Sequence, residues 1–331
     1  MAVIVTGAAG FIGMHVCERL LDRGERVIGV DIFNAYYDIR LKEARAARLA
    51  ARPRFDMARI DVADARAFEM LVHQSAPSTI VHLAAQAGVR YSLDHPFAYE
   101  RANVAGHLSV LEAARHGPSV KQLVYASSSS VYGDRPLGGA GFREDDALAA
   151  PASLYAATKR AGELMSATYA SLFGIAQTGL RFFTVYGPWG RPDMAYFGFT
   201  EKILAGETID VFGEGRMARD FTYIDDIVDG IVGVIDHPAD VGEHRVFNIG
   251  DSRPVGLMDM IGVLERALGR EAVKRMLPMQ PGDVTATFAD ISRLSALCGY
   301  SPKVKLEDGL PRFVEWYQGF RRDSVNQGSP L

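Results

Sequence analysis

Short apolar runs alternate with amphipathic helical segments along the N-terminal half of the chain. Buried strands are predicted at 2–6, 26–31, 79–84, 120–127 and 176–184, and helices at 11–23, 66–75, 97–115 and 153–173. Strands that alternate with helices favour a parallel sheet covered by helices on both faces. Because parallel crossovers are right-handed, the sequence predicts an α/β fold with a doubly wound parallel sheet.

The pattern changes after Thr184, and this change predicts a second, smaller domain. Residues 186–222 are rich in glycine, proline and aromatic side chains with one helix at 197–205, whereas 223–236 has helical spacing and 245–249 favours a strand. The remaining segment, 254–331, is mixed. We therefore expect an interleaved division, with a larger domain from 1–187 plus about 223–249 and a smaller mixed α/β domain from 188–222 plus about 250–331.

The composition is that of an ordinary globular protein. Of 331 residues, 48% are hydrophobic and 23% charged, and 36 basic against 40 acidic side chains leave a net charge of −4. This balance argues against a nucleic-acid or anionic membrane partner. Two cysteines cannot form a disulfide framework, and no apolar stretch is long enough to span a membrane. We therefore expect a cytoplasmic protein.

Two stretches have an unusual charge pattern. Residues 1–17 contain no Asp, Glu, Lys or Arg, but no basic segment precedes them and glycines interrupt them, so they do not resemble a signal peptide. The second stretch, 40–54, is basic. We interpret it as the solvated face of an alanine-rich helix rather than a nucleic-acid surface; its basic residues are Arg40, Lys42, Arg45, Arg48, Arg52 and Arg54.

A glycine motif, Gly7-x-x-Gly10-x-x-Gly13, follows the first predicted strand and begins the first predicted helix. In this context glycines allow a tight turn, a close approach of pyrophosphate to the backbone, and tight helix–strand packing, as in Rossmann domains. Asp31 ends the second strand, where an acid accepts the ribose hydroxyls and repels a 2′-phosphate. Asp61 and Val62 are candidates for contacts with the adenine of the dinucleotide. The motif predicts binding of NAD rather than NADP.

A second motif, Tyr155-x-x-x-Lys159, places a phenol and an ammonium on one face of the helix at 153–173. A nearby positive charge favours the phenolate and lowers the pKa of a tyrosine. Tyr155 is therefore a candidate base for a sugar hydroxyl. Before this helix, the strand at 120–127 ends in four consecutive serines, 127–130, at the sheet edge where α/β proteins bind ligands.

These motifs resemble the extended short-chain dehydrogenases/reductases, and within them the NAD-dependent sugar-nucleotide epimerase/dehydratase family. The resemblance covers nearly the whole chain and is sharpest in TGAAGFIG, HLAAQAGVRYS, YASSSSVYG, SLYAATK, LRFFTVYGPWGRPDM and RDFTYIDD. The set is more similar to UDP-glucuronate 4-epimerases than to UDP-galactose 4-epimerases. The family implies tightly held NAD, a UDP-sugar in the smaller domain, and a homodimer built on the helices at 97–115 and 153–173.

The resemblance also implies roles for individual residues. Tyr155 acts as base, Lys159 binds the nicotinamide ribose, and Ser128 bonds the reacting C4 hydroxyl. Further cofactor contacts are implied at Phe11, Ile12, Leu83, Ala84, Ala85, Asn103 and Phe182. Relatives often have Asn directly after the acid that corresponds to Asp31, whereas this chain has Ile32. One ribose or adenine contact is then missing or replaced by Asn34.

Candidate substrate contacts come from several segments of the chain. Arg219 offers a planar fork of donors for the diphosphate, and the family implies Val211 and Phe212 near uracil and Asp283 near the ribose. A sugar carboxylate needs cationic or hydroxyl donors. The candidates for it are Arg90, Ser129, Ser130, Thr184 and Arg191.

These residues favour a UDP-glucuronate 4-epimerase over the related reactions. A 4,6-dehydratase needs an acid–base pair where this chain has Ser129 and Ser130, and decarboxylases of the same substrate carry a glutamate in that loop, which is absent here. Two alternatives stay open: an epimerase of UDP-hexoses or UDP-N-acetylhexosamines, and a non-catalytic NAD-binding regulator. No metal site is expected.

Overall fold

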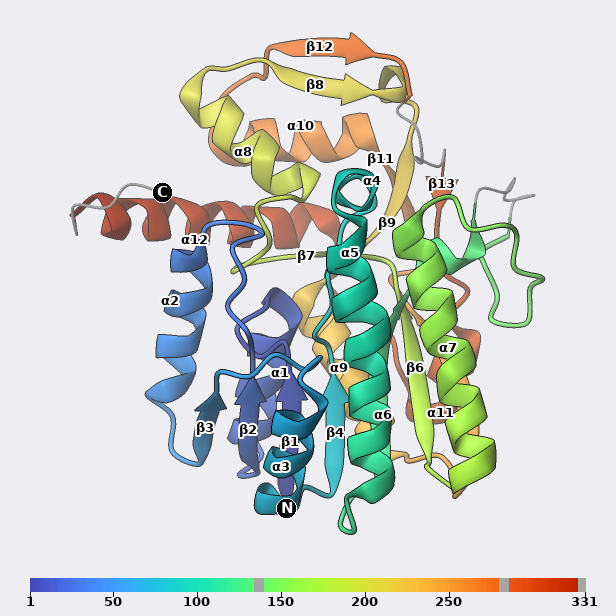
Figure 1. The fold of residues 1–331 in the computed structure, drawn as a ribbon. Coiled ribbons are helices and arrows are strands. Elements are labelled where there is room, and N and C mark those ends of the chain that lie inside the picture. The colour runs from blue at the N-terminus through green and yellow to red at the C-terminus, as the bar shows by residue number, and fades with distance from the viewer. Residues whose placement is uncertain (134–139, 280–285, 327–331) are drawn as a thin grey trace.

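A parallel sheet of seven strands runs through the centre of the molecule (Figure 1), and its order is β10-β6-β5-β4-β1-β2-β3. The computed structural model describes residues 1–133, 140–279 and 286–326. Strand order reverses direction next to β1, which is the arrangement of a doubly wound fold. The predicted fold class is therefore confirmed. The strands are β1 (Ala2–Thr6), β2 (Arg26–Val30), β3 (Phe55–Ala58), β4 (Thr79–His82), β5 (Gln122–Ser128), β6 (Gln177–Phe182) and β10 (His244–Ile249).

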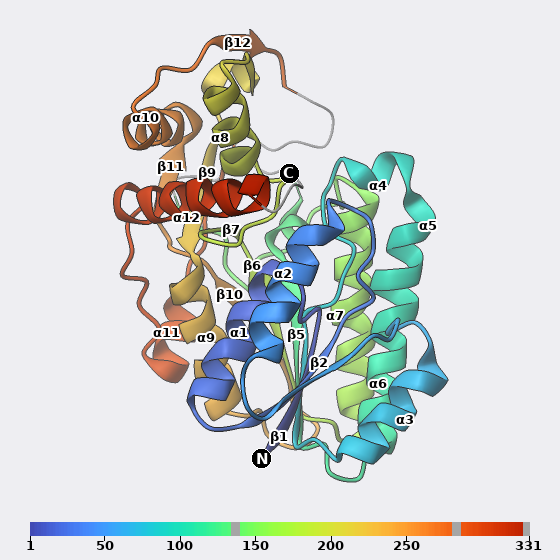
Figure 2. The ribbon, with the colours of Figure 1, turned by 90° about the vertical axis from the view of Figure 1, so that its left-hand side faces the viewer.

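Helices cover both faces of this sheet, as Figure 2 shows. One face carries α1 (Phe11–Asp22), α2 (Ile39–Ala50), α9 (Ile224–Asp236) and α11 (Ser292–Cys298). The other carries α3 (Ala65–Ser75), α6 (Gly106–His116) and α7 (Leu154–Phe173), with α4 (Tyr91–Asp94), α5 (Pro96–Tyr99) and the π-helix Glu100–Ala105 leading into α6. The predicted helix at 97–115 is thus interrupted by a π-helical turn. None of the helices in the described ranges is long and apolar enough to cross a membrane.

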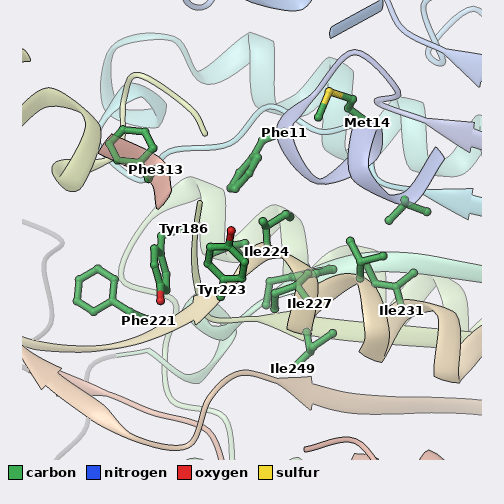
Figure 3. Close-up of a cluster of buried hydrophobic side chains, with 14 of the residues drawn as sticks. Phe11, Met14, Tyr186, Phe221, Tyr223, Ile224, Ile227, Ile231, Ile249 and Phe313 are labelled. Atoms are coloured by element: carbon green, nitrogen blue, oxygen red, sulfur yellow. The ribbon is translucent and has the colours of Figure 1, made fainter. Parts of the chain in front are cut away.

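The core beneath α9 shows why this segment is a helix. Ile224, Ile227 and Ile231 recur at spacings of three and four residues, and all three are fully buried. In Figure 3 they lie between Met14 of α1 and Ile249 of β10. An apolar stripe at this spacing faces one side of a helix, and each buried isoleucine contributes ~1.5–3 kcal/mol. This stripe fixes α9 against the sheet.

Smaller sheets lie beyond the carboxyl ends of the central strands, in the upper part of Figure 1. The chain leaves the central sheet after Phe182, and the predicted strand at 176–184 is therefore two strands. The strands here are β7 (Thr184–Tyr186), β8 (Ile209–Phe212), β9 (Ala218–Tyr223), β11 (Pro254–Gly256), β12 (Lys274–Leu277) and β13 (Ala286–Thr287). The helices are α8 (Ala195–Ala205), α10 (Leu257–Leu268) and α12 (Leu306–Asn326), and short 3-10 turns occur at Ser129–Tyr132 and Gly213–Gly215.

The basic segment at 40–54 differs from its expected solvated face. Arg40 and Arg48 are exposed and pair with Asp38 and Glu18. Lys42 and Arg45, by contrast, are buried, and Arg45 has no exposed surface at all. The expectation is therefore wrong for these two residues, because α2 turns one face toward the glycine loop.

Candidate active site

A cavity of about 470 Å³ opens at the carboxyl ends of the central strands. This is the edge of an open α/β sheet at which ligands bind. It gathers most of the predicted site residues, from segments far apart in the chain. The predicted residues that line it are Gly7, Gly10, Phe11, Ile12, Gly13, Asp31, Asn34, Asp61, Val62, Leu83, Ala84, Ala85, Ser128, Ser129, Ser130, Tyr155, Lys159, Phe182, Thr184, Arg191 and Arg219.

The glycine loop fits a dinucleotide phosphate. Gly7 has a φ of +71°, and a Cβ on Gly7 would lie 2.9 Å from the Ala84 nitrogen. A Cβ on Gly13 would lie 2.0 Å from the Gly7 oxygen, so the helix could not approach the strand with a larger residue. Gly10 is the N-cap of α1 and supplies no side-chain cap. The first N–H groups of α1 therefore stay available for an anion.

Backbone N–H groups of the glycine loop and of the segment after β2 hold the Asp31 carboxylate in place. Its carboxylate accepts hydrogen bonds from the Ala9 N–H (3.1 Å) and the Phe33 N–H (2.8 Å). A carboxylate has about four acceptor positions, so two backbone bonds leave capacity for the ribose hydroxyls. Asp61 accepts from the Ala63 N–H at 2.9 Å and pairs with Arg101. The residues present therefore fit NAD.

Asn103 lies behind the cofactor side of the cavity and does not line it. Its side chain is buried and brackets Gln86, accepting from the Gln86 N–H (2.8 Å) and donating to the Gln86 carbonyl (3.0 Å). The loop that carries Gln86 also carries Leu83, Ala84 and Ala85. Asn103 thus shapes this loop, and a direct contact with the cofactor stays a prediction.

Tyr155 and Lys159 lie one turn apart on α7, which begins after the N-cap Ser153. The Lys159 ammonium donates to the Ala126 carbonyl at 2.8 Å. Burial lowers the pKa of Lys159 to about 8, against the opposing effect of the Glu163 charge. The ammonium is therefore tied to the end of β5, next to the serines.

Burial, one hydrogen bond and two nearby charges determine the electrostatic surroundings of Tyr155. Burial raises the pKa of Tyr155, while a hydrogen bond with Ser128 and the charge of Arg191 lower it and Asp193 raises it further. Arg191 and Asp193 thus act on the phenol with opposite signs. The hydroxyl of Ser128 also accepts hydrogen bonds from the N–H (3.2 Å) and hydroxyl (2.9 Å) of Ser130.

Arg191 reaches the cavity from the loop after β7. Its guanidinium donates to both carboxylate oxygens of Asp193, at 3.0 and 2.8 Å. The Tyr36 hydroxyl donates to the same carboxylate at 3.2 Å. The two contacts with Asp193 use one edge of the guanidinium. Because a guanidinium has five N–H donors, other donors of Arg191 remain for a ligand.

Three predicted substrate contacts lie elsewhere. Arg90, Val211 and Phe212 do not line the cavity; Val211 is fully buried, and the Arg90 guanidinium lies 5.1 Å from the centre of the Phe212 ring. Asp283 lies outside the described residues. Other residues of the cavity, among them Tyr36, Lys42 and Met194, were not predicted from the sequence. Lys42 belongs to the basic stretch, but nothing in its spacing distinguishes it from the exposed members.

A comparison with known proteins assigns the class. Residues 3–250 match the model of the NAD dependent epimerase/dehydratase family, and the chain belongs to this family. Among curated relatives, a probable UDP-glucuronate 4-epimerase of Rhizobium meliloti (strain 1021) is 46% identical, over 97% of this chain and 98% of the relative. UDP-glucuronate 4-epimerase 5 of Arabidopsis thaliana is 45% identical, over 99% of this chain and 78% of the relative.

Solved structures agree with this assignment. The UDP-glucuronic acid 4-epimerase from Bacillus cereus, crystallised with UDP-glucuronic acid and NAD, superposes with a TM-score of 0.90 at 36% identity, covering 97% of this chain and 100% of the other. The family resemblance predicted from the motifs is therefore confirmed.

Proposed function

We propose that this protein is a UDP-glucuronate 4-epimerase, an isomerase that interconverts UDP-glucuronate and UDP-galacturonate with NAD. The proposal is supported by the names of the relatives and by one observation in particular. The same cavity is lined by the phenol of Tyr155, by the hydroxyls of Ser128, Ser129 and Ser130, and by the guanidinium of Arg191. This combination provides a base next to donors for an anionic sugar.

The roles of the residues follow from their positions. Tyr155 removes the proton of the C4 hydroxyl, and Ser128, which is hydrogen-bonded to Tyr155, orients that hydroxyl. NAD supplies the redox chemistry, by accepting a hydride from C4 and returning it. Lys159 orients the nicotinamide ribose. After the 4-keto sugar has turned over in the cavity, Tyr155 returns the proton to the C4 oxygen, and C4 regains its hydroxyl in the opposite configuration.

The carboxylate of the substrate needs particular control. A 4-keto uronate is a β-keto acid, which loses carbon dioxide readily when its carboxylate is perpendicular to the ring. Ser129, Ser130, Thr184 and Arg191 line the cavity and supply hydroxyl, N–H and guanidinium donors. We infer that they hold the carboxylate near the plane of the ring and so prevent decarboxylation.

The substitution Thr184→Ala tests this inference. Removal of one hydroxyl donor should leave epimerisation detectable and release a UDP-pentose as a side product. Proton NMR separates the epimer, the pentose and unchanged substrate. Normal epimerisation without any pentose would contradict the role given to Thr184.

The activity itself is tested by incubating the protein with UDP-glucuronate and, separately, with UDP-glucose and UDP-N-acetylglucosamine. We expect UDP-galacturonate from the first and little product from the others. Turnover of only the neutral sugars would favour the hexose epimerase, and no turnover with bound NAD would favour a regulator.

We further propose a cytoplasmic homodimer whose interface includes α5 and α7. Its support is the exposure of large apolar side chains on these helices: Phe97, Leu164 and Leu172 are 82%, 64% and 67% exposed. We also retain the interleaved division into an NAD-binding and a UDP-sugar-binding domain. Light scattering of the purified protein measures the oligomeric state.

A further inference from the structure

Arg45 is a buried charge without an acidic partner. Its side chain has no exposed surface, and among the described residues no carboxylate forms an ion pair with it. All of its hydrogen-bond partners are neutral oxygens, and its Nε has none. Burial lowers the pKa of Arg45, and the charge of Asp31 does not offset this effect, so the buried charge is costly. Because burying this charge costs free energy, we infer that Arg45 has a role that an apolar side chain could not have.

The guanidinium joins two loops of the active site. One nitrogen donates to the Ala9 carbonyl (3.1 Å) and the Tyr37 hydroxyl (2.6 Å). The other donates to the carbonyls of Trp189 (2.6 Å) and Gly190 (2.9 Å). Ala9 belongs to the glycine loop, and Trp189 and Gly190 directly precede Arg191. A planar fork can bind both loops at once, which an ammonium cannot do with the same geometry.

The Ala9 peptide is held on both sides. Its N–H donates to Asp31, and its carbonyl accepts from Arg45. A continuous chain of hydrogen bonds therefore runs from the proposed ribose ligand, Asp31, through the glycine loop to the residues before Arg191. Arg45 donates hydrogen bonds to both loops and so joins them.

The loop before Arg191 has a conformation that needs support. Trp189 has a φ of +62° and Gly187 one of +143°. A Cβ on Gly190 would lie 2.0 Å from the Tyr196 hydroxyl. A non-glycine residue at positive φ costs ~1–3 kcal/mol and persists only when its surroundings fix it. The two carbonyl contacts of Arg45 are such a constraint.

We propose that Arg45 is a positioning residue that holds the Arg191 loop in a fixed place relative to the glycine loop, and so sets the preference for a carboxylated sugar. The proposal rests on the proposed function, because it takes Arg191 as a ligand of the uronate. Arg45 does not line the cavity and acts through Arg191.

Kinetics of Arg45→Met test the proposal, with Arg48→Met as the control on the exposed face of α2. Methionine is similar in length and removes the buried charge, but it leaves the oxygens that Arg45 binds without this donor, so some loss of stability is expected. Thermal melting verifies the fold. We expect KM for UDP-glucuronate to rise ~10-fold, or ~1.4 kcal/mol, with a smaller change in kcat and in the slow turnover of UDP-glucose. Unchanged discrimination between the two sugars would overturn the proposal.

Two further variants separate geometry from charge and from indirect effects. Arg45→Lys keeps the charge but loses the fork, so it should behave like Arg45→Met; wild-type discrimination in Arg45→Lys would contradict a positioning role. In an Arg191→Met background, Arg45→Met should add nothing to KM, since the two residues act in sequence. Additive effects would also contradict the proposal.

Tryptophan fluorescence gives a readout that does not depend on activity. The chain has two tryptophans, Trp189 and Trp316, and their rings lie 5.2 Å apart. Quenching by acrylamide therefore reports on the loop that Arg45 binds. We expect Arg45→Met, but not Arg48→Met, to increase quenching in the NAD-loaded protein. If the wild type fails to epimerise UDP-glucuronate, the proposed function fails, while unchanged quenching in Arg45→Met refutes the loop contact by itself.

Discussion

The two halves of the cavity are built in different ways. The cofactor half uses backbone groups at the ends of β1, β2 and β4, where the glycine loop leaves no room for side chains. The substrate half uses long side chains such as Arg191, which other side chains hold in place. A backbone cradle depends on residues close together in the chain. The Arg191 guanidinium binds Asp193, and this carboxylate in turn depends on a residue far away, since Tyr36 and Asp193 are 157 positions apart.

Tyr155→Phe should have the largest effect, because Tyr155 serves both halves. It removes the base but keeps the ring that packs edge-on against Tyr99 at 6.0 Å. We expect kcat to fall by ~10²–10⁴-fold with NAD still bound. NMR of the product and absorbance of released NAD measure both. Tyr169→Phe on the same helix, whose hydroxyl bonds Glu112, is the control. Turnover that survives in Tyr155→Phe would assign the base elsewhere.

Gly13→Ala should weaken NAD binding and leave the substrate half of the cavity unchanged. The added Cβ would meet the Gly7 oxygen at 2.0 Å, so the backbone of the loop must shift. We expect NAD affinity to fall ~10- to 100-fold, measured by retention of NAD on gel filtration. Gly319→Ala is the control, because a Cβ there meets nothing within 4 Å. Full retention of NAD in Gly13→Ala would show that the loop tolerates the displacement.

The cofactor half could be predicted from the sequence more fully than the substrate half, because it depends on residues that are close together in the chain. The strands, the glycine loop, Asp31 and the Tyr155/Lys159 pair are local patterns with a fixed periodicity, and the structure brings all of them to one cavity. Arg45 resembled its exposed neighbours in α2, because burial depends on a loop 144 positions away. The charge of Asp193 beside Tyr155 was missed for a similar reason. Contacts between distant loops leave no periodic pattern.

Asp193→Asn should sharpen the comparison in the substrate half. Burial raises the pKa of Tyr155, and the Asp193 charge adds to this effect. Neutralising Asp193 lowers that pKa, so the acid limb of kcat/KM should move to lower pH, since the base acts when deprotonated. Arg191 also loses one charge-assisted contact, and KM for UDP-glucuronate should rise ~5-fold. Asp145→Asn, which alters an exposed pair with Arg143, is the control. A limb that moves to higher pH would contradict this electrostatic account.

The smallest expected effect concerns histidines beneath the cofactor half. Thr6 links them to the cavity, since its hydroxyl accepts from the Ala84 N–H (3.1 Å) and lies 2.8 Å from His82 Nδ1. The His107 ring lies 5.3 Å from that of His82, and its Nε2 lies 2.8 Å from the Ser166 hydroxyl. Burial, together with the charge of Lys159, lowers the pKa of His107 to about 3. His107 is therefore neutral in the folded protein.

This neutral state predicts the pH dependence of stability. Below its ordinary pKa of 6.5, His107 binds a proton in the unfolded chain but not in the folded one until about pH 3. The free energy of unfolding should therefore decrease as the pH is lowered from 6.5 to about 3, by ~1.4 kcal/mol per pH unit for each such histidine. His107→Gln should lose one such contribution, whereas His73→Gln, at an exposed site, should not. Urea unfolding of the three proteins at a series of pH values below 6.5 measures the slopes. Equal slopes would mean that His107 is already protonated in the fold, which would leave two neighbouring rings and Lys159 charged together in the core.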